Sequence, residues 1–398
     1  MSDKIKRLME EVRELEASPE NQRRKNMYRW GNRIARDQWR GMPKNDHSIK
    51  YGNLPVQIDM PAPYWHKCLR IDYKKHFVSG EQFVEDMLRI KIERFKQIPD
   101  DIFVDKDINM FMGVPFGASF FGHQILFMQD TDPEVRYRQL FTNEEELKQL
   151  GMVDFYRDGL MPLAIRLYEE ALEAVDPDFH VQFPQWIRAP FGICAYARGY
   201  QELLMDFLLD PDFAEEEMRY FTDCRIHWHE EMCRYLGERV DTLDLFNDDV
   251  NIPNLSPQLY EEFVLPCEIR LSETIGSVQY WHSCGNTAAL APVIAKIPNL
   301  YMYNNGPWTD PRPVAEVFGG TDTVIELQVN PQSVVVEGDE RQIHDYLSDA
   351  VRAWLDFDVS GATIRANNVV PQRYEGFALE RVKEFIRIAR QVIEEQCR

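Results

Sequence analysis

The stretch Val278-Gln-Tyr-Trp-His-Ser-Cys-Gly-Asn286 decides how the rest of the chain is interpreted. Residues 278–281 are apolar and aromatic and predict a short buried strand, and residues 288–297 have the pattern of a helix. His282 and Cys284 stand between them, at the carboxyl end of the strand. Side chains at i and i+2 of a strand point to the same side, and imidazole and thiolate are both zinc ligands. The pair predicts a metal site; the alternative is a packed cysteine beside a hydrogen-bonded histidine.

The alternation of strand and helix continues on both sides of this stretch. Strand patterns occur at residues 242–246, 278–281, 300–303, 323–328 and 362–366, and each is followed by a helix pattern, the last at residues 374–395. Strand-like residues 102–104 and 179–183 add units in the first half. We therefore predict an α/β protein with a (β/α)8 TIM barrel at residues 101–398. Residues 1–100 are predicted to be an N-terminal helical extension without its own sheet.

Polar side chains recur where these strands end. They are Asp248 and Asp249, His282 and Cys284, Asn304 and Asn305, Glu326 within its strand, and Asn367 and Asn368. The carboxyl ends of all strands of a TIM barrel meet at one face, where such proteins keep their active sites. We therefore predict that these groups converge on one site. Two alternatives stay open, since aspartates also cap turns and asparagines also adopt left-handed loop conformations.

The composition excludes several classes of partner. The chain carries 45 Lys and Arg against 66 Asp and Glu, a net charge of −21, which argues against nucleic acid and anionic membranes. Residues 1–50 differ, with 13 basic against 8 acidic residues, and are interpreted as a basic arm that lies on an acidic body. Seven scattered cysteines without a Cys-x-x-Cys pair favour a reducing compartment. No apolar run approaches the length of a membrane span, so we expect a soluble cytoplasmic protein.

Three other residues could in principle bind a metal. His229 and Cys233 stand four apart in a helix pattern at residues 213–236, so they share a helix face. His123 follows a glycine-rich stretch. We interpret all three as packed structural side chains, because buried histidines and cysteines are more often packed than metal-bound.

Several segments resemble the uroporphyrinogen decarboxylase superfamily in residue content and order. They are Leu243-Asp-Leu-Phe-Asn-Asp-Asp249, Leu255-Ser-Pro-Gln-Leu-Tyr-Glu-Glu-Phe-Val-Leu-Pro266, His282-Ser-Cys-Gly-Asn286 and Arg188-Ala-Pro-Phe-Gly192. The likeness is closer to the decarboxylase-like methyltransferases that serve corrinoid proteins than to the true decarboxylases, whose Arg-rich N-terminal signature is not found. The resemblance covers roughly residues 100–395 and implies a TIM barrel with its site in the barrel mouth.

In the methyltransferase branch, the resemblance implies zinc held by His282, Cys284 and a cysteine at the end of the last strand. Asn367 stands about where that cysteine belongs, and an amide is a poor zinc ligand compared with a thiolate. The third ligand is therefore expected elsewhere, with Glu326 or Asp249 as candidates, or else zinc is not bound in the familiar way.

The function implied is methyl transfer. The metal activates a small methylated substrate for O- or N-demethylation, or activates a thiol acceptor, and a separate corrinoid protein carries the methyl group. The predicted catalytic residues are Asp248, Asp249 and Glu326, the last two as acids that protonate the leaving atom. Glu326 is included because a carboxylate in an apolar strand is costly to bury without a partner. The predicted substrate-binding residues are Trp281, Asn305, Trp308 and Asn367.

Two other functions stay open. One is a metal-free lyase or decarboxylase on the same barrel, in which Asp248 or Asp249 stabilises a protonated intermediate. The other is a binding protein without activity. A stoichiometric bound metal would favour methyl transfer and its absence the lyase. A homodimer is the assembly considered, and the sequence does not determine the oligomeric state.

Overall fold

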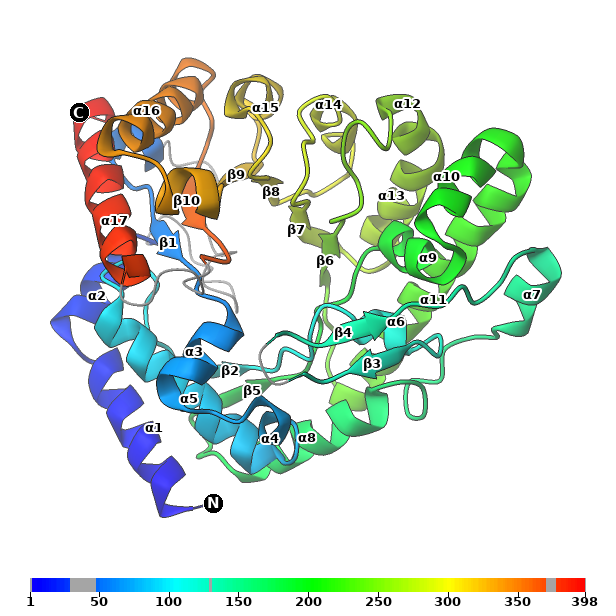
Figure 1. Cartoon of the computed structure of the whole chain (residues 1–398), viewed down its shortest axis with the longest axis horizontal. Helices are drawn as coiled ribbons and strands as arrows, with labels where there is room; N and C mark the ends of the chain where they lie inside the picture. The colour runs from blue at the N-terminus through cyan, green and yellow to red at the C-terminus, as the bar shows by residue number, and fades with distance from the viewer. Residues whose placement is uncertain (1, 29–47, 129–130, 370–376, 398) are drawn as a thin grey trace.

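The strands of the computed structural model surround a central space, and helices cover them from outside (Figure 1). The structure describes residues 2–28, 48–128, 131–369 and 377–397. Its strands are β1 (Val56–Ile58), β2 (Asp107–Asn109), β3 (Gln124–Leu126), β4 (Glu134–Arg136), β5 (His180–Gln182), β6 (Thr242–Phe246), β7 (Ser277–His282), β8 (Met302–Asn305), β9 (Val324–Val329) and β10 (Ala362–Ala366).

Helices follow most of these strands. They are α1 (Asp3–Glu16), α2 (Pro19–Asn26), α3 (Ala62–Leu69), α4 (Tyr73–His76), α5 (Gly80–Gln97), α6 (Phe116–Ser119), α7 (Glu144–Gln149), α8 (Met161–Glu173), α9 (Pro190–Arg198), α10 (Tyr200–Leu209), α11 (Pro211–Leu236), α12 (Pro257–Leu259), α13 (Leu265–Thr274), α14 (Ala291–Ile294), α15 (Pro311–Phe318), α16 (Glu340–Asp356) and α17 (Phe377–Gln396), with the short turns η2 (Ser48–Tyr51), η3 (Tyr260–Val264) and η4 (Pro331–Val336). Among the described residues, no helix has both the length and the apolar character needed to cross a bilayer.

The fold is a TIM barrel, as predicted. Six strands form one parallel sheet in the order β1-β10-β9-β8-β7-β6, and β2 and β5 form a second parallel pair on the opposite side of the central space (Figure 1). A parallel bridge between Arg188 and Phe246 joins the chain after β5 to β6. Parallel strands of this kind place all their carboxyl ends at one face.

The first hundred residues differ from a purely helical extension. Strand β1 lies within them and pairs with β10, with Gln57 opposite Arg365. The free edge of β1 is covered by two buried carboxylates: the amide of Val56 donates to Asp101 at 2.9 Å and that of Ile58 to Asp100 at 2.8 Å. Short strands with no alternating pattern give little periodic signal, which is why β1 was not foreseen.

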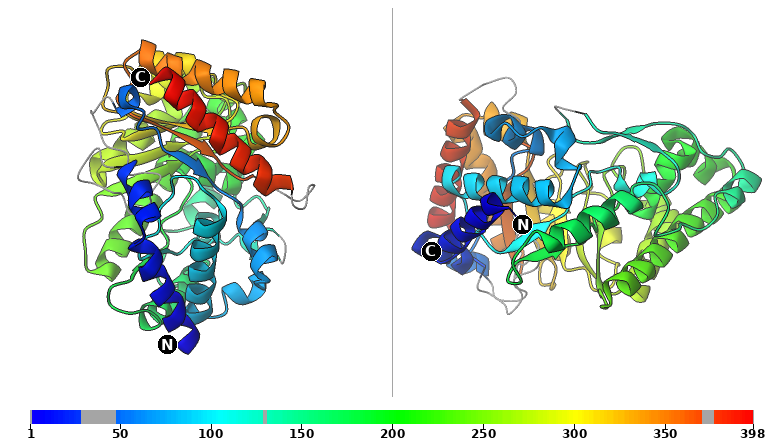
Figure 2. Two further views of the ribbon diagram at one scale, coloured as in Figure 1. Left: turned by 90° about the vertical axis from the view of Figure 1, so that its left-hand side faces the viewer. Right: turned by 90° about the horizontal axis from the view of Figure 1, so that it is seen from below.

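Alternate residues of the strands face two different environments. The outward side chains of β6 to β9, such as Leu245, Trp281 and Leu327, are buried in the large core beneath the outer helices. Phe246, Tyr280 and other inward side chains form a smaller apolar cluster inside the barrel. Helix α17 lies across β1, and α1 packs along α5 on the same side of the molecule (Figure 2). The inward face is therefore where polar groups can reach a common space.

The predicted elements match the structure best in the second half. Strands β6 and β10 have the predicted bounds, and Ser256 caps α12 by accepting a hydrogen bond from the amide of Leu259 at 3.2 Å. In the first half, residues 102–104 are not a strand; β2 begins at Asp107, and the antiparallel pair β3–β4 was not foreseen. Residues 29–47 of the basic arm and residues 374–376 of the last predicted helix lie outside the described residues.

Candidate metal centre

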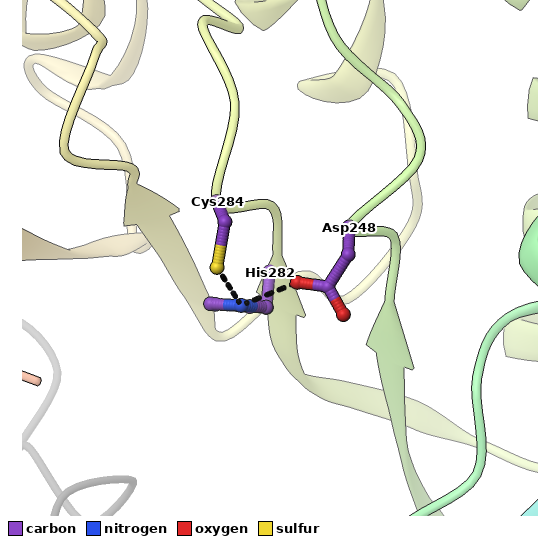
Figure 3. A group of neighbouring side chains, drawn as sticks. All are labelled: Asp248, His282 and Cys284. Carbon is purple, nitrogen blue, oxygen red and sulfur yellow. Dashed lines mark hydrogen bonds and ion pairs between the residues drawn. The ribbon is translucent and has the colours of Figure 1, made fainter. Parts of the chain in front are cut away.

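Three side chains with metal-ligand chemistry meet at the carboxyl ends of β6 and β7. They are Asp248, His282 and Cys284, whose donor atoms all lie within 4.8 Å of one another (Figure 3). His282 Nε2 lies 3.0 Å from Asp248 Oδ1 and 3.3 Å from Cys284 Sγ. Among the described residues, this is the one group of three or more such side chains. The predicted convergence therefore holds for this trio.

The loops after β6 and β7 are held against each other, which fixes the trio. The amide of Asn247 donates to the carbonyl of His282 at 2.7 Å, and Ser283 Oγ donates to the carbonyl of Val250 at 2.8 Å. Gly285 completes this packing, because a Cβ there would lie 2.2 Å from Cβ of Asn251. A side chain at this position would push the two loops apart.

The electrostatics of the trio favour an ion pair in the metal-free protein. Burial lowers the pKa of His282, but Cys284 and Asp248 outweigh it and raise that pKa to about 10. Burial raises the pKa of Asp248, yet hydrogen bonding to His282 and the charge of Arg188 hold it well below its usual range. Arg188 Nη2 lies 3.4 Å from Asp248 Oδ2, and Arg188 Nη1 donates to Asp249. Arg188 therefore holds both carboxylates.

The donor set suits a zinc-like ion. Imidazole, thiolate and carboxylate are the three zinc ligands found in proteins, and three protein ligands with an open fourth position characterise catalytic sites. Bonds of about 2.0–2.3 Å in a tetrahedral site place ligand atoms about 3.3–3.8 Å apart, so the observed spacings need only small adjustments. Asp248, rather than Glu326, Asp249 or Asn367, supplies the third donor in this arrangement.

The other side of the His282 ring contacts a polar network inside the barrel. Its Nδ1 lies 3.2 Å from the hydroxyl of Tyr280, and that hydroxyl donates to Glu326. Asn304 Nδ2 donates to the same carboxylate oxygen at 2.8 Å, and Arg365 Nη1 at 3.3 Å. Glu326 is fully buried and lies behind His282, away from Cys284. Among the described residues, Tyr280 connects it to His282.

A cavity of about 1240 Å³ opens on the trio. Asp248, His282, Cys284 and Asn367 border it, and so do the aromatic rings of Trp186, Phe246 and Tyr280. Trp186 and Phe246 stack at a centroid distance of 4.2 Å. The cavity thus offers an apolar wall beside a charged site, a combination typical of small-molecule sites.

Three predicted substrate-binding residues lie elsewhere. Trp281 is fully buried on the outward side of β7, where its Nε1 donates to Glu268 at 3.0 Å. The amide of Asn305 donates to the carbonyl of Thr309 at 2.9 Å, and Trp308 is 67% exposed beside a different surface hollow. The structure does not bring these three into the cavity. Trp281 and Asn305 point outward because neighbouring residues of a strand face opposite sides, and Trp308 lies in the exposed loop after β8.

The remaining histidine and cysteine candidates behave as packed side chains. His229 Nε2 contacts the carbonyl of Val240 at 2.8 Å, and the amide of Val240 donates to Cys233 Sγ at 3.4 Å. His123 is buried, and burial lowers its pKa to about 4. Residues that the sequence did not single out as functional are Arg188 and Arg365. The available signal for Arg365 was a charged residue inside an apolar strand, the same signal that drew attention to Glu326.

The chain is similar to known methyltransferases and to one protein family. The family model described as uroporphyrinogen decarboxylase (URO-D) matches residues 84–359. A methylated-thiol–coenzyme M methyltransferase of Methanosarcina mazei is 25% identical over 154 residues, which is 39% of this chain and 40% of that protein. The chain thus aligns with less than half the length of this relative. A solved methyltransferase structure from Methanosarcina mazei covers 89% of this chain and 96% of its own, with a TM-score of 0.62 at 14% identity, a likeness of fold.

Proposed function

Because the chain belongs to the uroporphyrinogen decarboxylase family, we propose that it is a methyltransferase of that family with a metal held by Asp248, His282 and Cys284. It transfers a methyl group between a small methylated substrate, or a thiol, and a corrinoid carried by a partner protein. The observation that carries this proposal is the meeting of the three donors at one edge of a large cavity. The similarity to a methylated-thiol–coenzyme M methyltransferase supports the reaction class.

A bound zinc ion would supply Lewis acidity, which activates a methylated heteroatom or favours the thiolate form of a thiol. The protein side chains supply two negative charges, from Asp248 and Cys284, and one neutral imidazole. His282 must lose its Nε2 proton for this, since metal ligands bind in their deprotonated form. Cys284 is exposed and His282 is buried, so the site is open toward the cavity on its cysteine side.

Arg188 orients the carboxylate of Asp248, on the side of the trio away from Cys284. By pairing with one oxygen of Asp248, it leaves the other oxygen directed at His282. It also holds Asp249, whose pKa burial and the neighbouring Asp248 raise, while Arg188 opposes them. We propose Asp249 as the acid that protonates the leaving heteroatom in a demethylation. Gly192 leaves room for this, because a Cβ there would lie 3.0 Å from Asp249 Oδ2.

The aromatic wall of the cavity favours substrates whose methyl group can pack against an aromatic ring. Trp186 and Phe246 border the cavity together with the trio. Flat aromatic faces bind methyl groups on aromatic ethers, thioethers or ammonium nitrogen through dispersion and, for a cation, through cation–π attraction. A cavity of this size also leaves room for the reactive end of a partner-bound cofactor.

Metal analysis of the purified protein tests the proposal most directly. We expect about one zinc per chain, lost in His282→Ala and in Cys284→Ala. Cys233→Ala is the matched control, since its sulfur accepts a hydrogen bond from the amide of Val240 and does not belong to the trio, so the metal should stay in place. Methyl transfer between methylcobalamin and a panel of small thiols, followed by the absorption spectrum of the cobalamin, should disappear with the metal.

The opposite result would point to another function. If the native protein binds no metal and both His282→Ala and Cys284→Ala keep their activity, methyl transfer at this trio is excluded. A decarboxylase or lyase that relies on the aspartates alone would then be the function to test.

A further inference from the structure

The two ring nitrogens of His282 have different partners. Nε2 faces Asp248 and Cys284, at 3.0 and 3.3 Å, and Nδ1 faces the hydroxyl oxygen of Tyr280 at 3.2 Å. A histidine binds a metal through one nitrogen, and the hydrogen bond at the other nitrogen sets which one that is. The contacts of Tyr280 therefore decide whether Nε2 can act as a ligand.

Among the described residues, the Tyr280 hydroxyl has a carboxylate to donate to. Its oxygen donates to Glu326, and the same carboxylate oxygen also accepts from Asn304 and Arg365. A carboxylate paired with a guanidinium accepts hydrogen bonds and has none to give. Tyr280 thus uses its hydrogen on Glu326, and its oxygen acts as an acceptor, from Nη1 of Arg365 at 3.5 Å and from Nδ1 of His282 at 3.2 Å.

We infer that Tyr280 and Glu326 are positioning residues that keep the hydrogen of His282 on Nδ1 and so turn a lone pair of Nε2 toward the metal site. This inference rests on the proposed metal site and assigns Glu326 a role different from that of a proton donor. Glu326 lies on the far side of the imidazole ring from Asp248 and Cys284 and acts through Tyr280. Partners of this kind, behind a ligating histidine, typically change metal affinity about 10–100-fold.

The network continues to β10 and β1, at one edge of the six-stranded sheet. Arg365, on β10, also donates to Asp59 through Nε at 2.7 Å, and Asp59 follows β1. Burial lowers the pKa of Arg365, but the charges of Glu326 and Asp59 outweigh it and raise that pKa overall. Asp59 and Arg365 lie outside the segment matched by the family model. The orientation of His282 therefore depends on parts of the chain that flank this segment.

Two substitutions test the inference with zinc affinity as the readout. Tyr280→Phe removes the hydroxyl and keeps the ring and the Glu326–Arg365 pair. Glu326→Gln keeps a carbonyl oxygen for the donors Tyr280, Asn304 and Arg365. It removes, however, the negative charge that holds the hydrogen of Tyr280, and so weakens the preference for a hydrogen on Nδ1 of His282. We expect each variant to bind zinc about 10–100-fold more weakly than the native protein in competition with a chelator.

Glu268→Gln is the matched control. Glu268 is also fully buried and also accepts from a tyrosine and an asparagine, Tyr260 at 2.5 Å and Asn247 at 2.7 Å. Glu268 faces the outward side of β7 and does not contact His282. The Glu268→Gln variant should therefore bind zinc as tightly as the native protein. Nitrogen-15 NMR of the histidine rings should show Nδ1–H and metal-bound Nε2 for His282 in the zinc-loaded native protein.

The outcomes separate this inference from the proposed function. If native protein binds zinc and Tyr280→Phe binds it equally well, the positioning role is wrong while the metal site stands. An equal loss in Glu268→Gln, or a metal on Nδ1, would also overturn the inference. If native protein binds no zinc, the proposed metal site itself fails. Should Glu326→Gln not fold, the result for Tyr280→Phe decides.

Discussion

Each face of strand β7 is hydrogen-bonded to one buried glutamate, and the two glutamates have different roles. On the inward face, Tyr280 and His282 lead to the buried Glu326; on the outward face, Trp281 donates to the buried Glu268. Both glutamates are fully buried, and each accepts hydrogen bonds from one tyrosine and one asparagine. Their environments differ in one respect, the charge of the remaining donor.

Glu326 faces the guanidinium of Arg365 at 3.3 Å, whereas the donors to Glu268 are neutral side chains. Burial raises the pKa of Glu268 to about 7, against the lowering effect of its three hydrogen bonds. A carboxylate needs a cation to stay ionised at no cost inside a protein. The inward glutamate thus pairs with a cation behind the candidate metal site, whereas the outward one lies among neutral donors in the core.

The largest effect is expected on the inward face, at the third metal ligand. Asp248→Ala removes one of three protein ligands and should weaken zinc binding by more than about 100-fold, beyond the effect of a residue behind a ligand. Asn367→Ala removes the residue at the position where the resemblance implies a cysteine ligand, and it should leave zinc affinity unchanged. Isothermal titration with zinc measures both. Equal losses in the two variants would contradict the assignment of Asp248.

Glu268, on the outward side of β7, should make the free energy of unfolding depend on pH. Between about pH 4.5 and 7, the folded protein keeps the proton of Glu268 that the unfolded chain releases. The free energy of unfolding therefore falls as pH rises through this window and is level on either side of it. The difference between a pKa of about 7 and the ordinary 4.5 corresponds to on the order of 3 kcal/mol.

Denaturant unfolding of native protein and of Glu268→Gln across this range isolates the contribution. Burial also raises the pKa of Glu217, to about 8, so the native protein has a second slope of the same sign. The difference between the two proteins removes that second slope. A difference that does not change with pH would mean that Glu268 keeps the same charge in the folded and unfolded states.

A smaller change is expected at the turn that follows β7. Gly285→Ala places a Cβ against Asn251 and should cost about 1–3 kcal/mol of unfolding free energy, with a displacement of Cys284. Zinc affinity should fall together with stability. Calorimetry with and without zinc measures both effects. A variant as stable as the native protein, with unchanged zinc affinity, would show that the loops after β6 and β7 accommodate the added methyl group without cost.

The smallest effect is expected from Trp281→Phe. It keeps an aromatic ring in the core and removes the indole N–H that donates to Glu268, at a cost of about 1–2 kcal/mol in unfolding free energy. Zinc affinity should be unchanged, because the side chain faces away from the cavity. A loss of zinc binding in this variant would mean that the two faces of β7 are coupled.

Much of the barrel was predictable because its second half repeats one pattern. Residues 242–246 and 362–366 stand out as strands between helices, and their predicted bounds are those of the structure. The first half was harder, since β1, β2 and β5 each have three residues and no alternation of their own. Such strands are recognised by what they pair with, and pairing partners are distant in sequence.

Local periodicity and motif order along the chain are enough to predict the barrel class, the family, and the placement of His282, Cys284 and Asp248 at strand ends. Which carboxylate joins the pair depends on contacts between strands that are distant in sequence. Asp248, Asp249 and Glu326 are alike in sequence terms, but the pairing of β6 with β7 brings Asp248 to His282 and leaves Asp249 to Arg188, and the pairing of β7, β8 and β9 places Glu326 behind the imidazole. Strand register sets which side chains face each other, and it arises from pairings that no short stretch contains.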